Sequence, residues 1–165
     1  MLEDAIDSRR IDHLLTPSAL QDKVVVVIGL GSGSFPAMQH LAMCGVSQWI
    51  LFDKDVLDEV NLVKHPGMRK DLGKSKTVIG KEWILDRNPS AIVTNHDVDI
   101  TTVEGEKLLG DAIGNSSIVL CGTDNQNTRE IVSRICVMLE KACVFALIYR
   151  TGFGGDAYLY DPGIT

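Results

Sequence analysis

Short apolar runs alternate along this chain with longer segments of helical periodicity. The run over residues 23–28 is apolar and β-branched, as expected for a strand buried on both faces. Helices are predicted over residues 75–87, 101–113 and 126–141, and a further one has Pro36 near its start and Gly45 at its stop. Further strands are predicted over residues 48–52, 91–95, 117–121, 143–148 and 157–160.

This alternation of strands and helices predicts an α/β fold. We expect a Rossmann-like, doubly wound, mostly parallel sheet with helices on both faces. The length of 165 residues is that of one domain, so we assign residues 1–165 to a single domain, with residues 1–22 as its helical N-terminal segment. In such sheets, ligands bind beyond the carboxyl ends of the strands.

Composition narrows the class of protein. A hydrophobic fraction of 45% and a charged fraction of 23% are ordinary for a soluble protein, and a net charge of −6 argues against general nucleic-acid binding. The sequence has neither an apolar run of membrane-spanning length nor a signal peptide, which favours a cytoplasmic protein without a membrane role. The four cysteines lack zinc-ligand spacing and are interpreted as small buried hydrophobic residues; they are Cys44, Cys121, Cys136 and Cys143.

A glycine-rich run follows the first predicted strand and opens the next helix. Its small residues let the backbone approach a phosphate, and the helix beyond supplies free N–H groups. Asp53 lies 24 residues after the first glycine, where a carboxylate can bind ribose hydroxyls of either ATP or NAD. The nucleotide-binding candidates in the run are Gly29, Gly31, Ser32 and Gly33, and Ser34 stands where a further glycine is usual.

Polar residues after later strands suit a metal-bound triphosphate. The segment 64–76 is basic, and we assign Lys64 and Lys76 to phosphates while Arg69 and Lys70 are interpreted as solvated. Asp124 follows an apolar strand and is either a Mg²⁺ ligand or the N-cap of the next helix. Asp55 is predicted to cap a turn.

Together these residues resemble the adenylation domain of the ThiF, MoeB and HesA family, the ubiquitin-activating E1-like enzymes. The resemblance extends from Val24 to about Pro162. The shared motifs are the glycine-rich loop, Asp-x-Asp at 53–55, Asn-Leu-x-Lys at 61–64, Gly-x-x-Lys at 73–76, Asn-Pro at 88–89 and Thr-Asp-Asn at 123–125. Two departures are Lys64, where the family has arginine, and Ser34 in place of glycine.

The resemblance implies a function. Such enzymes bind ATP and Mg²⁺ and adenylate the C-terminal carboxylate of a small ubiquitin-like or sulfur-carrier protein ending in Gly-Gly, with release of pyrophosphate. It places Asn61, Lys64 and Lys76 on phosphates, Asp53 on ribose and Asp124 on the metal. It also implies a homodimer in which Arg9, or failing that Arg10, reaches the phosphates of the neighbouring subunit. The implied catalytic residues are therefore Asp124, Lys76 and Arg9; a solvated arginine pair is the alternative.

Other functions stay open. A related branch adenylates a modified tRNA base, and a non-catalytic E1-like partner subunit would keep the fold alone. An NAD-dependent oxidoreductase is a third alternative, although it has no need of Asn61, Lys76 and Asp124. We expect the chain to end before the cysteine-bearing segment of the family, so no zinc site and no transfer cysteine are predicted within it.

Overall fold

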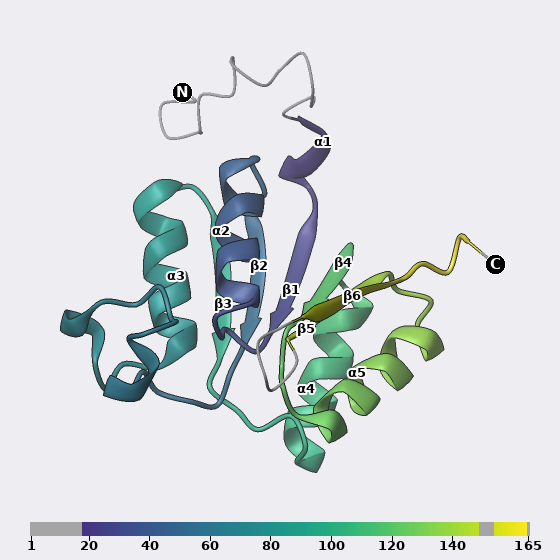
Figure 1. Cartoon of the computed structure of the whole chain (residues 1–165). Helices are drawn as coiled ribbons and strands as arrows, with labels where there is room; N and C mark the ends of the chain where they lie inside the picture. Colours follow the sequence, from purple (N-terminus) through teal and green to yellow (C-terminus); the bar gives the residue numbers. More distant parts are fainter. Residues whose placement is uncertain (1–17, 149–153, 165) are drawn as a thin grey trace.

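The structure, a computed structural model, describes residues 18–148 and 154–164 (Figure 1). Within these ranges strands and helices alternate as the sequence predicts. In chain order the elements are α1 (Ser18–Gln21), β1 (Val24–Ile28), α2 (Ser34–Met43), β2 (Gln48–Phe52), the 3-10 turns η1 (Glu59–Asn61) and η2 (Arg69–Asp71), α3 (Lys76–Arg87), β3 (Ile92–His96), α4 (Val103–Gly114), β4 (Ile118–Cys121), α5 (Gln126–Met138), β5 (Cys143–Ile148) and β6 (Gly155–Tyr160).

The strands form one six-stranded sheet in the order β3-β2-β1-β4-β5-β6. Strands β1 to β5 are parallel, and β6 runs antiparallel along β5. The strand order reverses beside β1, which pairs with both β2 and β4, so the loops after these strands leave in different directions and open a crevice between them. The predicted doubly wound, mostly parallel α/β fold is confirmed.

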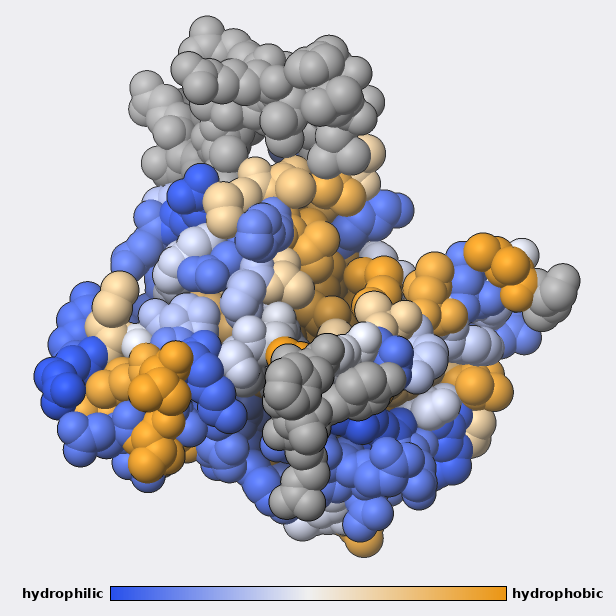
Figure 2. All heavy atoms as spheres, viewed as in Figure 1, coloured by the Kyte–Doolittle hydropathy of each residue, from blue (hydrophilic) through white to orange (hydrophobic). Residues whose placement is uncertain are grey.

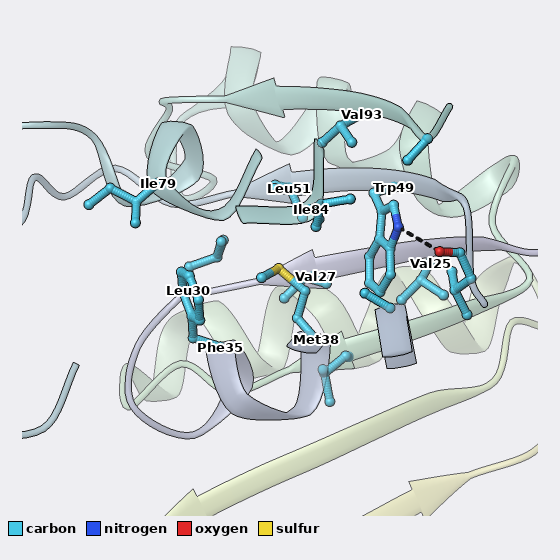
Figure 3. Packing of buried hydrophobic residues seen from close by; sticks show 14 of the residues in the cluster. Val25, Val27, Leu30, Phe35, Met38, Trp49, Leu51, Ile79, Ile84 and Val93 are labelled. Carbon is cyan, nitrogen blue, oxygen red and sulfur yellow. Dashed lines mark hydrogen bonds between the residues drawn. The ribbon is translucent and has the colours of Figure 1, made fainter. Parts of the chain in front are cut away.

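Helices cover both faces of the sheet. Figure 1 shows α2 and α3 on one side and α4 and α5 on the other. The alternating side chains of β1 supply both cores, because Val25 and Val27 face one layer while Val26 and Ile28 face the other. Figure 3 shows the first core, in which the buried Trp49 donates its indole N–H to the carbonyl oxygen of Val46 at 3.2 Å.

Local capping explains where the helices start. Ser75 precedes α3 and its hydroxyl accepts a hydrogen bond from the backbone N–H of Thr77. Asn125 precedes α5 and accepts from the N–H of Thr128. Asp124 is therefore not the cap of α5, and its carboxylate remains available for another role.

Two predictions about the end of α5 and the cysteines are wrong. The helix ends at Met138 rather than at residue 141, since Glu140 adopts a left-handed φ of 51° that a helix cannot continue through. Met138, the last residue of the helix, is 72% exposed. Cys44 is exposed because it caps the C-terminus of α2; the other three cysteines are buried, as predicted.

Apolar side chains are also exposed on the segment that carries η1 and η2. Figure 2 shows this hydrophobic surface at the lower left. Val60, Val63 and Met68 are 72%, 89% and 63% exposed there. The same segment leads into one edge of the cavity described below, so it is the side of the site that presents apolar surface to solvent.

The contact between the first residue of α2 and the residue after β4 gives a stability prediction. A Cβ on Gly122 would overlap the fully buried Ser34 Oγ, so Gly122→Ala should lower the free energy of unfolding by about 1–3 kcal/mol. Gly110→Ala is the matched control: a Cβ there meets nothing within 4 Å, and alanine in α4 should stabilise by about 0.5–1 kcal/mol. Urea unfolding measures both. Equal effects of the two substitutions would contradict this account of the packing.

Candidate functional site

The loop between β1 and α2 lies at the centre of the site. Gly29 has a φ of +77°, and a Cβ on it would lie 3.2 Å from the backbone nitrogen of Thr123, so the loops after β1 and β4 touch here. Gly33 precedes α2 and provides no side-chain cap. The first N–H groups of α2 are thus free of a side-chain acceptor at a position suited to an anion.

Asp53 follows β2 and holds this loop. Its Oδ2 accepts a hydrogen bond from the N–H of Leu30 at 2.6 Å, and its Oδ1 accepts from the N–H of Asp55 at 2.9 Å. Burial raises the pKa of Asp53, while the two backbone hydrogen bonds and the nearby Lys76 act in the opposite direction. Each carboxylate oxygen has a second lone pair, so Asp53 can still accept a hydrogen bond from a ligand hydroxyl.

His65 holds the same loop from the other side. The N–H of Gly67 donates to Nδ1 at 2.9 Å, so the ring proton is on Nε2, which donates to the carbonyl oxygen of Leu30 at 2.8 Å. The ring also packs edge-on against Phe35, with centroids 5.1 Å apart. Burial lowers the pKa of His65 from its ordinary value, so the imidazole is neutral at pH 7.

Lys76 is the most enclosed cation of the site. It begins α3, its side chain is 11% exposed, and its Nζ lies 2.8 Å from Asp55 Oδ2. The sequence predicts that Asp55 caps a turn. In the structure its carboxylate instead pairs with Lys76, 21 positions away in the chain. The other basic residues of segment 64–76 behave differently: Lys74 pairs with Asp71 and Glu82, and Arg69 pairs with Glu59 in solvent, as its assignment to a solvated role predicts.

A cavity of about 720 Å³ lies beyond the carboxyl ends of β1 to β5. It collects every predicted site residue that falls within the described ranges; these are Gly29, Gly31, Ser32, Gly33, Asp53, Asn61, Lys64, Lys76 and Asp124. Lys64 and Asp124 line it as exposed side chains. Arg9 and Arg10 lie outside the described residues.

The sequence interpretation missed several lining residues. Arg129 of α5 donates from Nε to the carbonyl oxygen of Thr123 at 2.9 Å and so fixes the loop that carries Asp124. Lys54 and Asp99 also line the cavity and form an ion pair of 2.8 Å, and the Lys54 ammonium holds the pKa of Asp99 well below its usual range. Arg129 lies in the first turn of the amphipathic helix α5. Its place shortly after the Thr-Asp-Asn motif is the one sequence signal that could have indicated a role in the site.

Two of the buried cysteines, Cys121 and Cys143, are unsuited to covalent chemistry. Burial raises the pKa of the Cys121 thiol to about 11, which leaves it protonated and unreactive at pH 7. Cys143 hydrogen-bonds with Cys136, and this contact together with burial raises the pKa of Cys143. Within residues 18–148 and 154–164 there is no cluster of three or more potential metal-binding His, Cys, Asp or Glu residues, and no helix that is long and apolar enough to cross a membrane.

The sheet order and the helices on both of its faces define an α/β fold of the Rossmann-like class. The sequence matches the ThiF family over residues 5–165, and the chain belongs to that family. It is 30% identical over 148 residues to the sulfur carrier protein ThiS adenylyltransferase of Escherichia coli, covering 87% of this chain and 55% of that protein. It is 26% identical to ubiquitin-like modifier-activating enzyme 5 of Dictyostelium discoideum, covering 84% of this chain and 39% of that protein.

A solved structure shows the same architecture. The E. coli MccB structure with ATP has a TM-score of 0.73 and 25% sequence identity, covering 90% of this chain and 43% of that one. The present chain thus spans about half or less of the length of the proteins that it matches. The recognition of a ThiF-type, E1-like adenylation domain is confirmed, and the curated relatives named here are an adenylyltransferase and an activating enzyme.

The neutral His65 makes stability depend on pH. Because its pKa is lower in the folded chain than the ordinary 6.5, the unfolded chain binds its proton first as the pH falls. The His65 contribution is therefore complete above pH 6.5 and is lost as the pH falls through the lower folded pKa. Urea unfolding from pH 8 to pH 5 should show this loss, and His65→Gln should remove it.

His40→Gln is the control for that experiment, since His40 is exposed on α2. Its pH dependence should match that of the unmodified chain. If His65→Gln and the unmodified chain lost stability in parallel on acidification, His65 would not be the group responsible.

Proposed function

We propose that this chain is the nucleotide-binding core of an enzyme that uses ATP to adenylate the C-terminal carboxylate of a small ubiquitin-like or sulfur-carrier protein. The observation that carries the proposal is the cavity at the carboxyl ends of the strands, where residues from four separate loops converge. Relatives whose names specify ThiS and a ubiquitin-like modifier support the class of partner.

The proposed reaction assigns a task to each side of the cavity. A carboxylate oxygen of the partner attacks the α-phosphorus, the new O–P bond forms, and the bond to the bridging oxygen breaks with its electron pair leaving on pyrophosphate. Asp53 binds the ribose, while the glycine-rich loop and Lys76 bind phosphate oxygens on which charge develops. Asn61, the last residue of η1, and Lys64 shortly after it line the cavity, and we assign them to the outer phosphates.

Asp124 suits Mg²⁺. Its carboxylate is exposed in the cavity, is not used to cap α5, and is the kind of hard oxygen donor that Mg²⁺ prefers. When bound, the ion would neutralise phosphate charge and orient the triphosphate. The charge of the cavity supports the need for it, because its lining aspartates equal its lysines and arginine in number: Asp53, Asp55, Asp99 and Asp124 against Lys54, Lys64, Lys76 and Arg129.

The equal number of negative and positive side chains in the cavity also supports an arginine that is supplied by a second copy of the chain. We propose a homodimer in which Arg9 of one chain adds positive charge to the cavity of the other, with Arg10 as the alternative, and a partner tail that ends in Gly-Gly. The four unpaired cysteines are compatible with the reducing cytoplasm, where we place the protein.

Calorimetric titration tests the nucleotide. The chain should bind Mg-ATP more tightly than NAD. Lys76→Met should weaken Mg-ATP binding about tenfold or more, because a charge-assisted hydrogen bond contributes roughly 1.5–3 kcal/mol. Lys70→Met is the matched control, since Lys70 is exposed and does not line the cavity. Tighter binding of NAD, or an equal loss in both variants, would overturn the proposal.

Sedimentation tests the dimer. The full chain should sediment as a dimer with Mg-ATP, and Arg9→Ala should weaken nucleotide binding severalfold without changing the sedimentation coefficient. A monomer that binds Mg-ATP normally would show that no arginine is supplied in trans.

A further inference from the structure

The ion pair between Lys76 and Asp55 joins two residues of unequal exposure. The Lys76 side chain is 11% exposed, whereas that of Asp55 is 55% exposed. An ammonium so enclosed needs a partner for its N–H donors, since leaving it unpaired away from water is costly. The half-exposed carboxylate has no such need, because water can replace the lysine at little cost.

The backbone fixes Asp55 beside Lys76 independently of this ion pair. The N–H of Lys76 donates to the carbonyl oxygen of Asp55 at 3.0 Å, and Val56 forms a β-bridge with Ser75. The N–H of Asp55 donates in turn to Asp53. The carboxylate of Asp55 is therefore held at the cavity by main-chain contacts that do not require its charge.

A second ion pair of the cavity provides the contrast. Lys54 and Asp99 are also 2.8 Å apart, but Asp99 accepts further hydrogen bonds from both the backbone N–H and the hydroxyl of Thr101. Lys54 is 56% exposed, so its ammonium is already hydrated. In the Lys54–Asp99 pair the carboxylate is held by further hydrogen bonds and the lysine is exposed to solvent. In the Lys76–Asp55 pair the lysine is enclosed and the carboxylate is exposed to solvent.

We propose that Asp55 is a positioning residue: it is the resting partner of Lys76, and a phosphate group of the bound nucleotide takes its place. This inference rests on the proposed function, because it needs an anionic ligand in the cavity. Asp55 keeps the ammonium ordered and directed to the cavity while the site is empty. A polyphosphate then offers a stronger acceptor, and the released carboxylate is hydrated.

The exchange has a measurable consequence for affinity. Nucleotide binding must break the ion pair and bring phosphate charge near the Asp55 carboxylate, so the carboxylate opposes binding. Asp55→Asn removes both costs and keeps the backbone contacts. Mg-ATP should consequently bind about two- to fivefold more tightly, the scale of a partly exposed ion pair.

The rate at which Lys76 is acetylated gives a second measurement. This rate would not change if Asp55 had only a structural role. In the nucleotide-free chain, the rate at which acetic anhydride modifies Lys76, followed by mass spectrometry, should rise severalfold in Asp55→Asn, since the ion pair no longer shields the amine. Mg-ATP should protect Lys76 in both proteins. The matched control is Glu106→Gln, which breaks a 2.8 Å ion pair with Arg134 on α4 and α5, outside this cavity. It should change neither the affinity nor the rate.

Each outcome decides between hypotheses. Tighter binding together with faster acetylation in Asp55→Asn supports the exchange. Unchanged or weaker binding, or acetylation at the rate of the unmodified chain, overturns it while leaving the proposed function intact. If none of the three proteins binds Mg-ATP, the proposed function itself fails, and this inference fails with it. Thermal unfolding checks that the variants are folded.

Discussion

The hydrogen bonds that hold the backbone of Leu30 are the constraint on which the rest of the cavity depends. Asp53 accepts from its N–H and His65 donates to its carbonyl oxygen, while its side chain is fully buried in the core between the sheet and helices α2 and α3. One residue thereby ties the glycine-rich loop to the end of β2 and to the segment after η1. The arrangement requires a neutral His65, because Nδ1 accepts from Gly67 while Nε2 donates to Leu30, so the fold of the loop depends on the protonation state of His65 as well as on packing.

Electrostatic pairing also explains why the cavity is not simply basic. Sequence order suggests a positive segment over residues 64–76, yet most of its cations are neutralised by acids brought close by the fold, as with Lys74 between Asp71 and Glu82. Of the lysines and the arginine in that segment, only Lys64 and Lys76 line the cavity. Together with Lys54 and Arg129 these lysines face four aspartates in the cavity lining, and in the proposed function this balance is offset by a metal ion or an added arginine.

The residues that could be predicted from sequence are those that follow strand ends. A parallel sheet brings these ends to one edge, so locating the β-branched runs was sufficient to bring Gly29, Asp53 and Asp124 together; β2 and β5 have the predicted bounds. Contacts between side chains far apart in the chain could not be predicted. The Asp55–Lys76 pair depends on the β-bridge between Val56 and Ser75, which no local pattern indicates.

The apolar part of the cavity lining is concentrated after β3 and at the end of β5. Most of the charged side chains follow β2 and β4. Val98 and Ile100 follow β3, on either side of the charged Asp99, and the end of β5 adds Ala146 to Ile148. In the proposed function the apolar residues after β3 are suited to a flat base, because Asp53 at the neighbouring strand end binds the attached ribose. The phosphates then extend across the glycine-rich loop towards Lys76 and Asp124. In the proposed function the order of the strands would therefore set the direction in which the nucleotide lies. The reacting phosphate would then lie on the side where Lys64 and the apolar side chains of the segment with η1 and η2 are exposed to solvent.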